Sequence, residues 1–146
     1  MTDMMKLVDG VLLPMTPDDI AAFEALQNSP DVMRAQVTGQ YNGLIAAGCQ
    51  LVFSQMPILT ATYAITPDMV SRVTAVAAGL AVGKGFPHGE ANLSWPDIEG
   101  TFRQFGPTDW LTLAAALEGY VADLDAWEAL AFTGTSAPLP AQPVTV

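Results

Sequence analysis

The chain has 146 residues and a net charge of −10, with five lysines and arginines set against fifteen aspartates and glutamates. This length suits one domain with its own core, and the scattered cations exclude the basic stripe that nucleic acid or an anionic membrane surface requires. Because 51% of the residues are hydrophobic and only 14% are charged, we expect surface that is buried in an assembly; an alanine-rich composition without any assembly is the alternative.

Cysteine and hydropathy patterns limit the kinds of site and the cellular location that we expect. Cys49 is the single cysteine, which excludes an internal disulfide and a multi-cysteine metal site. It lies in an apolar run, which favours a buried structural thiol over a nucleophile. The N-terminus lacks the basic region of a signal peptide, and the apolar run 70–82 is too short to span a membrane and contains Arg72. We therefore expect synthesis and folding in a cytoplasm, without membrane insertion.

The first third of the chain predicts a strand and two helices. Residues 10–14 read as an edge strand, because Pro14 cannot donate to a ladder. The run 16–19, Thr-Pro-Asp-Asp, supplies an N-cap and an acidic first turn for a helix to about residue 27. Ser-Pro-Asp at 29–31 opens a second helix to about Ala47 by the same rule, and Gly48 suits its C-terminal cap.

The remaining elements alternate extended and helical segments. Two extended runs, 49–54 and 58–65, precede a third helix over 67–82. Strands 93–95 and 101–105 form a hairpin, and Asp and Gly residues suit its turn. A last helix, capped by Thr108, covers 109–132, and its periodicity places these residues inward: Trp110, Leu113, Leu117, Tyr120, Val121 and Leu124.

These elements predict an α+β fold. A small antiparallel sheet, including the β-hairpin at about 93–105, has the helices over 67–82 and 109–131 on one face. We expect an N-terminal strand and helical segment over 1–48, an α+β domain over 49–132, and a proline-rich tail over 133–146. The tail composition predicts an extended arm outside the core.

No pattern of residues predicts catalysis. His88 is the only histidine and has no further ligands spaced for a metal. Gly-Lys-Gly at 83–85 follows a helix instead of preceding one, which excludes a phosphate-binding loop. Asp97 and Glu99 could do acid–base work, but residues at an exposed turn tip more often shape the turn. We expect no enzyme activity, metal, cofactor or small-molecule substrate; a hydrolase using Asp97, Glu99 and His88 is the weakest alternative.

Aromatic, glycine and proline residues follow one another in a recurring order over residues 43–128. The motifs are Tyr63-Ala64-Ile65, Phe86-Pro87-His88-Gly89, Leu93-Ser94-Trp95-Pro96-Asp97, Gly100, Phe105 and the helix from Trp110 to Leu124. This order resembles a family of uncharacterised small domains from tail-fibre, baseplate and tail-assembly gene clusters of phages and prophages of proteobacteria. The lead-in over residues 7–17 is similar to that of such proteins. The family has no established activity, so the resemblance implies a virion or tail-assembly context and no mechanism.

Two functions are consistent with this resemblance. The first is a structural or adaptor protein in the tail of the virion, at the baseplate or tail-fibre attachment, that binds other tail proteins or further copies of itself. The alternative is a tail-fibre assembly chaperone that the finished virion does not retain. Exposed aromatics and extended arms commonly carry such contacts, and the candidate partner contacts are Phe102, Trp110, Trp127, Leu139, Val144 and Val146. Deleting residues 133–146 is expected to leave the domain folded and to weaken assembly.

Overall fold

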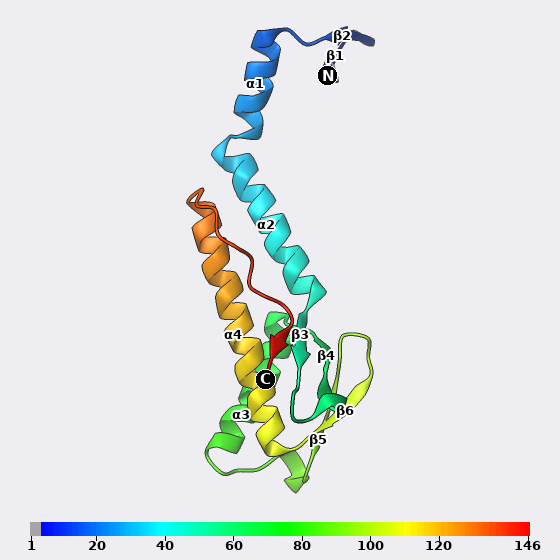
Figure 1. Ribbon diagram of the computed structural model, residues 1–146, viewed down its shortest axis with the longest axis vertical. Helices are drawn as coiled ribbons and strands as arrows, with labels where there is room; N and C mark the ends of the chain where they lie inside the picture. The colour runs from blue at the N-terminus through cyan, green and yellow to red at the C-terminus, as the bar shows by residue number, and fades with distance from the viewer. Residues whose placement is uncertain (1–3) are drawn as a thin grey trace. The chain divides into compact units, whose positions relative to one another are not determined.

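The computed structural model describes residues 4–146, which fall into two compact units (Figure 1). Unit 1 comprises the described residues up to Thr38, and unit 2 comprises Gly39–Val146. The boundary lies ten residues before the expected one at 48. Tyr41, Leu44 and Ile45 account for the difference, because they pack against the core of unit 2.

Unit 1 consists of a hairpin followed by helical segments. Strands β1 (Met5–Val8) and β2 (Val11–Pro14) pair antiparallel. Asp9 and Gly10 join them with φ values of 50° and 81°, as a two-residue hairpin turn requires. The predicted strand at 10–14 is therefore confirmed, but its partner β1 was not predicted, although Asp-Gly between two apolar runs is a strong hairpin signal.

The predicted helix boundaries in this part of the chain are confirmed. Helix α1 covers Pro17–Gln27 and begins with a reciprocal capping box between Thr16 and Asp19. Helix α2 covers Pro30–Ala47. It ends at Gly48, whose φ of +80° and close approach to the Tyr63 carbonyl leave no room for a Cβ atom.

Unit 2 contains two small sheets where one was expected. Strand β3 (Cys49–Val52) lies between β4 (Ala61–Tyr63), antiparallel, and β7 (Val144–Thr145), parallel. Strands β5 (Leu93–Pro96) and β6 (Phe102–Phe105) form a separate hairpin. The single-sheet prediction is wrong because the hairpin meets β4 through its turn, where the Ile98 N–H donates to the Thr62 carbonyl at 2.8 Å.

Two helices cover these strands. Helices α3 (Pro67–Ala81) and α4 (Pro107–Phe132) lie side by side (Figure 1). Both begin with proline at the first position, which the sequence predicts for α3. The N-cap of α4 is Gly106 instead of the expected Thr108. The short 3-10 turns η1 (Pro57–Leu59) and η2 (Pro87–Gly89) complete the unit, and η1 replaces the start of the extended run expected from residue 58.

Trp110 joins the elements of unit 2 at one point. Its ring makes edge-to-face contacts with Phe86, Trp95 and Phe105 at centroid distances of 5.9, 5.4 and 5.8 Å. Its indole N–H donates to the Val73 carbonyl of α3 at 3.0 Å. Helix α3, the β5–β6 hairpin, the 83–89 loop and α4 therefore share one core.

The C-terminal tail is extended, but it lies on its own domain. After α4 it runs back along the helix to β3 (Figure 1). The Val146 N–H donates to the Val52 carbonyl, and the Ser54 N–H donates to the Val146 carbonyl, both at 2.9 Å. Val144 and Val146 pack half-buried against the core. The expectation that the tail takes no part in the core is therefore wrong for its last residues.

Candidate functional site

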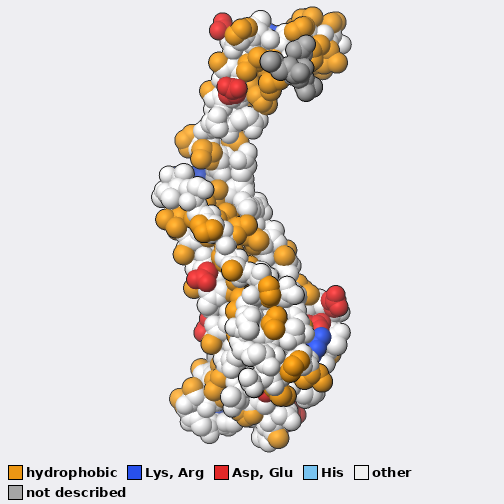
Figure 2. Space-filling model, viewed as in Figure 1, with side chains coloured by type: hydrophobic (Ala, Val, Ile, Leu, Met, Phe, Trp, Pro, Cys, Tyr) orange, Lys and Arg blue, Asp and Glu red, His pale blue; other side chains and the backbone are white. Residues whose placement is uncertain are grey.

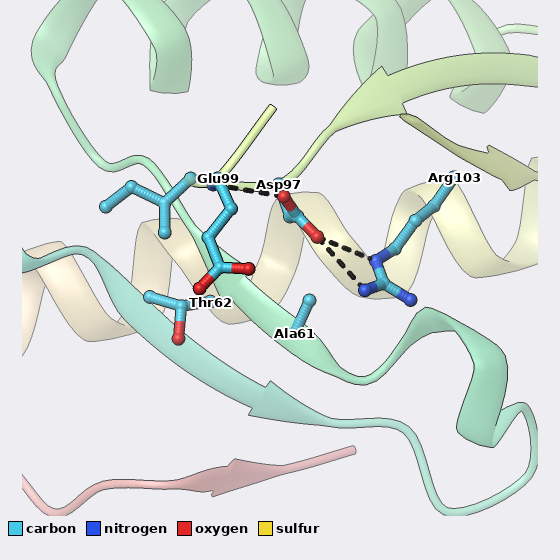
Figure 3. A pocket seen from close by; sticks show the side chains of 6 residues that line it. Ala61, Thr62, Asp97, Glu99 and Arg103 are labelled. Carbon is cyan, nitrogen blue, oxygen red and sulfur yellow. Dashed lines mark hydrogen bonds and ion pairs between the residues drawn. The ribbon is translucent and has the colours of Figure 1, made fainter. Parts of the chain in front are cut away.

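A polar hollow of about 190 Å³ lies at the turn of the β5–β6 hairpin (Figure 3). Asp97 and Arg103 point toward each other across one wall, and Thr62 and Ala61 contribute the side formed by β4. The hollow includes Glu99, so it holds both carboxylates that the sequence offers for acid–base chemistry.

Asp97 is fully engaged within the protein. Its Oδ1 accepts hydrogen bonds from the N–H groups of Glu99 at 3.0 Å and Thr101 at 2.9 Å. Its Oδ2 accepts from Nε and Nη2 of Arg103 at 3.1 and 3.0 Å. Only 8% of the residue is exposed, so the expectation of an exposed turn tip is wrong for Asp97. The turn closes around the carboxylate, which supplies the acceptor for two backbone donors.

These contacts keep Asp97 ionised. Burial alone raises the pKa of its carboxyl group, but hydrogen bonds from the Thr101 N–H, Arg103 and the Glu99 N–H outweigh it and hold the pKa below the ordinary value. Arg103 also donates to the Ile58 carbonyl of η1. The pair thus braces the hairpin turn against η1, and a carboxylate whose oxygens are already occupied is a poor general base.

The other candidate reactive groups, Cys49 and His88, form no catalytic arrangement in the described residues 4–146. Burial raises the pKa of the Cys49 thiol to about 12, which makes it a structural thiol. His88 lies exposed in η2. Among residues 4–146, no group of three histidine, cysteine or acidic residues could hold a metal ion.

The predicted partner contacts divide into buried and exposed residues. Trp110 and Trp127 are buried on the inner face of α4, which corrects the prediction for both. Val144 and Val146 are half-buried against the core of their own chain, so only part of each side chain is left for a partner. Phe102, 67% exposed, and Leu139 remain on the surface.

A larger apolar surface lies in unit 1, outside the six candidate partner contacts named above. None of residues 4–38 is buried. We define the unit 1 apolar surface as the ten large hydrophobic side chains that are exposed there: Met4, Met5, Leu7, Val8, Val11, Leu12, Leu13, Phe23, Leu26 and Met33. Figure 2 shows hydrophobic side chains gathered over the end of unit 1 that holds the hairpin. Two apolar runs around Asp-Gly were the signal that could have identified it.

The hairpin of unit 1 is apolar on both faces. Leu7 pairs with Leu12, and Val8 pairs with Val11. Since side chains alternate along a strand, the two pairs lie on opposite faces. Leu7 and Leu12 are 69% and 63% exposed.

The single cation of this hairpin is already paired. Lys6 Nζ lies 2.5 Å from Oδ2 of Asp19. The hydrogen bond from Lys6, followed by those from Thr16, lowers the pKa of Asp19 to about 2. The ion pair therefore leaves no free positive charge on the strands.

No family model, curated protein or solved structure matches this chain. No helix within residues 4–146 is long and apolar enough to cross a membrane. The function is therefore inferred from the surfaces and contacts described above.

Proposed function

We propose that the protein is a non-enzymatic structural or adaptor protein of a phage or phage-like tail, at the baseplate or tail-fibre attachment, that acts through protein–protein contacts. The observation that supports this proposal is the unit 1 apolar surface. Its ten side chains are between 39% and 69% exposed, and residues 4–38 bury no side chain that could form a core.

Such a surface is costly in water. A buried large hydrophobic side chain contributes about 1.5–3 kcal/mol that an exposed one does not. An isolated two-stranded hairpin is marginal, and so is an isolated helix as short as α1, the 11-residue Pro17–Gln27. Unit 1 therefore needs a binding partner to cover its side chains and stabilise its elements.

The chemistry of unit 2 supports a role without catalysis. Asp97 is occupied by Arg103 and two backbone donors, and Cys49 is buried with a raised pKa. These groups maintain the fold of unit 2. We infer that unit 2 is a rigid body that unit 1 attaches to a larger assembly.

The tail context comes from the resemblance of residues 43–128 to small domains of phage tail gene clusters. The same apolar surface also suits the alternative, a tail-fibre assembly chaperone, because an assembly factor must hold an unassembled partner through exposed hydrophobic residues.

Quantitative mass spectrometry of purified particles from the encoding element tests this proposal. A structural protein is expected in fixed stoichiometry with the other tail proteins. Absence from particles, with a fibre protein co-purifying from lysate, would favour the chaperone. Absence from both would refute a tail function.

A further inference from the structure

We propose that the unit 1 apolar surface is covered by a second copy of this chain, so that the protein self-associates through residues 4–38. This inference rests on the proposed function, because it names the partner of the same surface. It is carried by the two apolar faces of the hairpin and the area of the surface.

The hairpin needs cover on both faces. Leu7 and Leu12 project from one face and Val8 and Val11 from the other, and none of the four is buried within its own chain. A sheet with two apolar faces is normally found between two packed layers. A second copy brings helices and strands with the same apolar side chains. The surface of each copy can therefore cover the surface of the other.

The available area matches a specific interface. About 100 Å² of apolar surface per large side chain, roughly half exposed, gives the ten residues on the order of 500 Å². Two copies would bury about 1,000 Å² in total, which is where specific interfaces begin. The roughly 500 Å² on one copy lies toward the upper end of the apolar patches that monomers leave exposed.

Contact between two copies would be apolar and not charge-paired. All ten members of the surface are uncharged, and Lys6 is neutralised by Asp19. Unit 1 also exposes the carboxylates of Asp9, Asp18, Glu24 and Asp31, so the apolar side chains must hold two like-charged copies together. Association should therefore persist at high salt, which screens charge pairs and strengthens apolar burial.

Sedimentation velocity on the full chain, over a concentration series, tests this inference. The unmodified protein is expected to form a defined oligomer. In the double variant Leu7→Asp/Leu12→Asp, buried carboxylates should weaken association at least ~100-fold. Leu7→Ala/Leu12→Ala, which keeps the hairpin uncharged, should weaken association less. The matched control is Ile58→Asp/Val82→Asp, since these unit 2 residues are 72% and 70% exposed, and it should associate like the unmodified chain.

Tryptophan fluorescence shows whether unit 2 stays folded in each variant, because Trp95, Trp110 and Trp127 all lie in unit 2. Amide hydrogen exchange within residues 4–38 shows whether unit 1 keeps its hairpin and helices. A single-chain mass at every concentration, or an oligomer that both Leu7/Leu12 variants leave intact, would overturn self-association. A monomer that is nevertheless found in purified particles would leave the proposed tail function standing. An oligomer that is missing from particles and from fibre complexes would support self-association and refute the proposed tail function.

Discussion

The two units of this molecule share the same helix-start signals but differ in burial, because only unit 2 has a core. In unit 2, Trp110, Phe105 and Tyr63 are almost completely buried, whereas no residue of 4–38 is buried. Helices in both units begin with proline and an acidic first turn. The difference teaches that capping and turn signals specify elements, whereas a core requires several apolar faces that converge.

The largest expected effect is the loss of core packing in unit 2. Trp110→Ala removes the ring that joins α3, the hairpin and the 83–89 loop, and should destabilise unit 2 by about 3–5 kcal/mol. Denaturant unfolding followed by circular dichroism measures this loss. Phe102→Ala is the control, because its side chain is exposed and should change stability by less than about 0.5 kcal/mol. Similar losses for both would contradict the assigned core.

Removal of the last five residues tests whether the tail belongs to unit 2. Deleting Gln142–Val146 removes the hydrogen bonds to Val52 and Ser54 and exposes part of the core. We expect a loss of about 3 kcal/mol in the free energy of unfolding. Thr145→Ala, at an exposed position, is the control. An unchanged free energy of unfolding after the deletion would mean that the tail is an extended arm outside the core, as its composition predicts.

Acid titration measures how much the ionised Asp97 contributes to the stability of unit 2. The pKa of Asp97 is lower in the folded chain than its ordinary value of 3.8, so the folded state binds fewer protons than the unfolded state. Its stabilising contribution is present at neutral pH and declines as pH falls below about 4. Asp97→Asn should lower the melting temperature at neutral pH and flatten its dependence on acid. A variant with the same acid dependence as the unmodified chain would show that other carboxylates dominate.

The smallest effect compares helix starts in the two units. The Thr16 hydroxyl accepts from the Asp19 N–H, whereas Thr66 makes no side-chain cap bond at the start of α3. Thr16→Ala should therefore destabilise α1 by about 1 kcal/mol, seen as faster amide hydrogen exchange in its first turns. The matched change Thr66→Ala should leave exchange in α3 nearly unchanged. Equal responses would mean that the capping box contributes little.

Part of the site was readable from sequence and part was not. The Asp97–Gly100 turn follows from short-range backbone chemistry, because Asp and Gly suit such a turn and Gly100 has a positive φ. The burial of Asp97 depends on Arg103, which pairs across the hairpin and reaches η1. Phe102 is exposed because alternation along β6 points it away from the face that carries the buried Phe105.

The sequence by itself determined the α+β class and, to within about two residues, where the helices begin and end, because capping, proline and apolar periodicity act over a few residues. Tertiary structure decided the rest. The two sheets, the docked tail and the burial of Trp127 depend on residues far apart in the chain, such as Gln142, whose side-chain oxygen accepts from the Gln50 N–H. Local patterns carry no information about which distant strand edge is free to accept a segment, so composition could identify an extended tail but not the strand edge to which it binds.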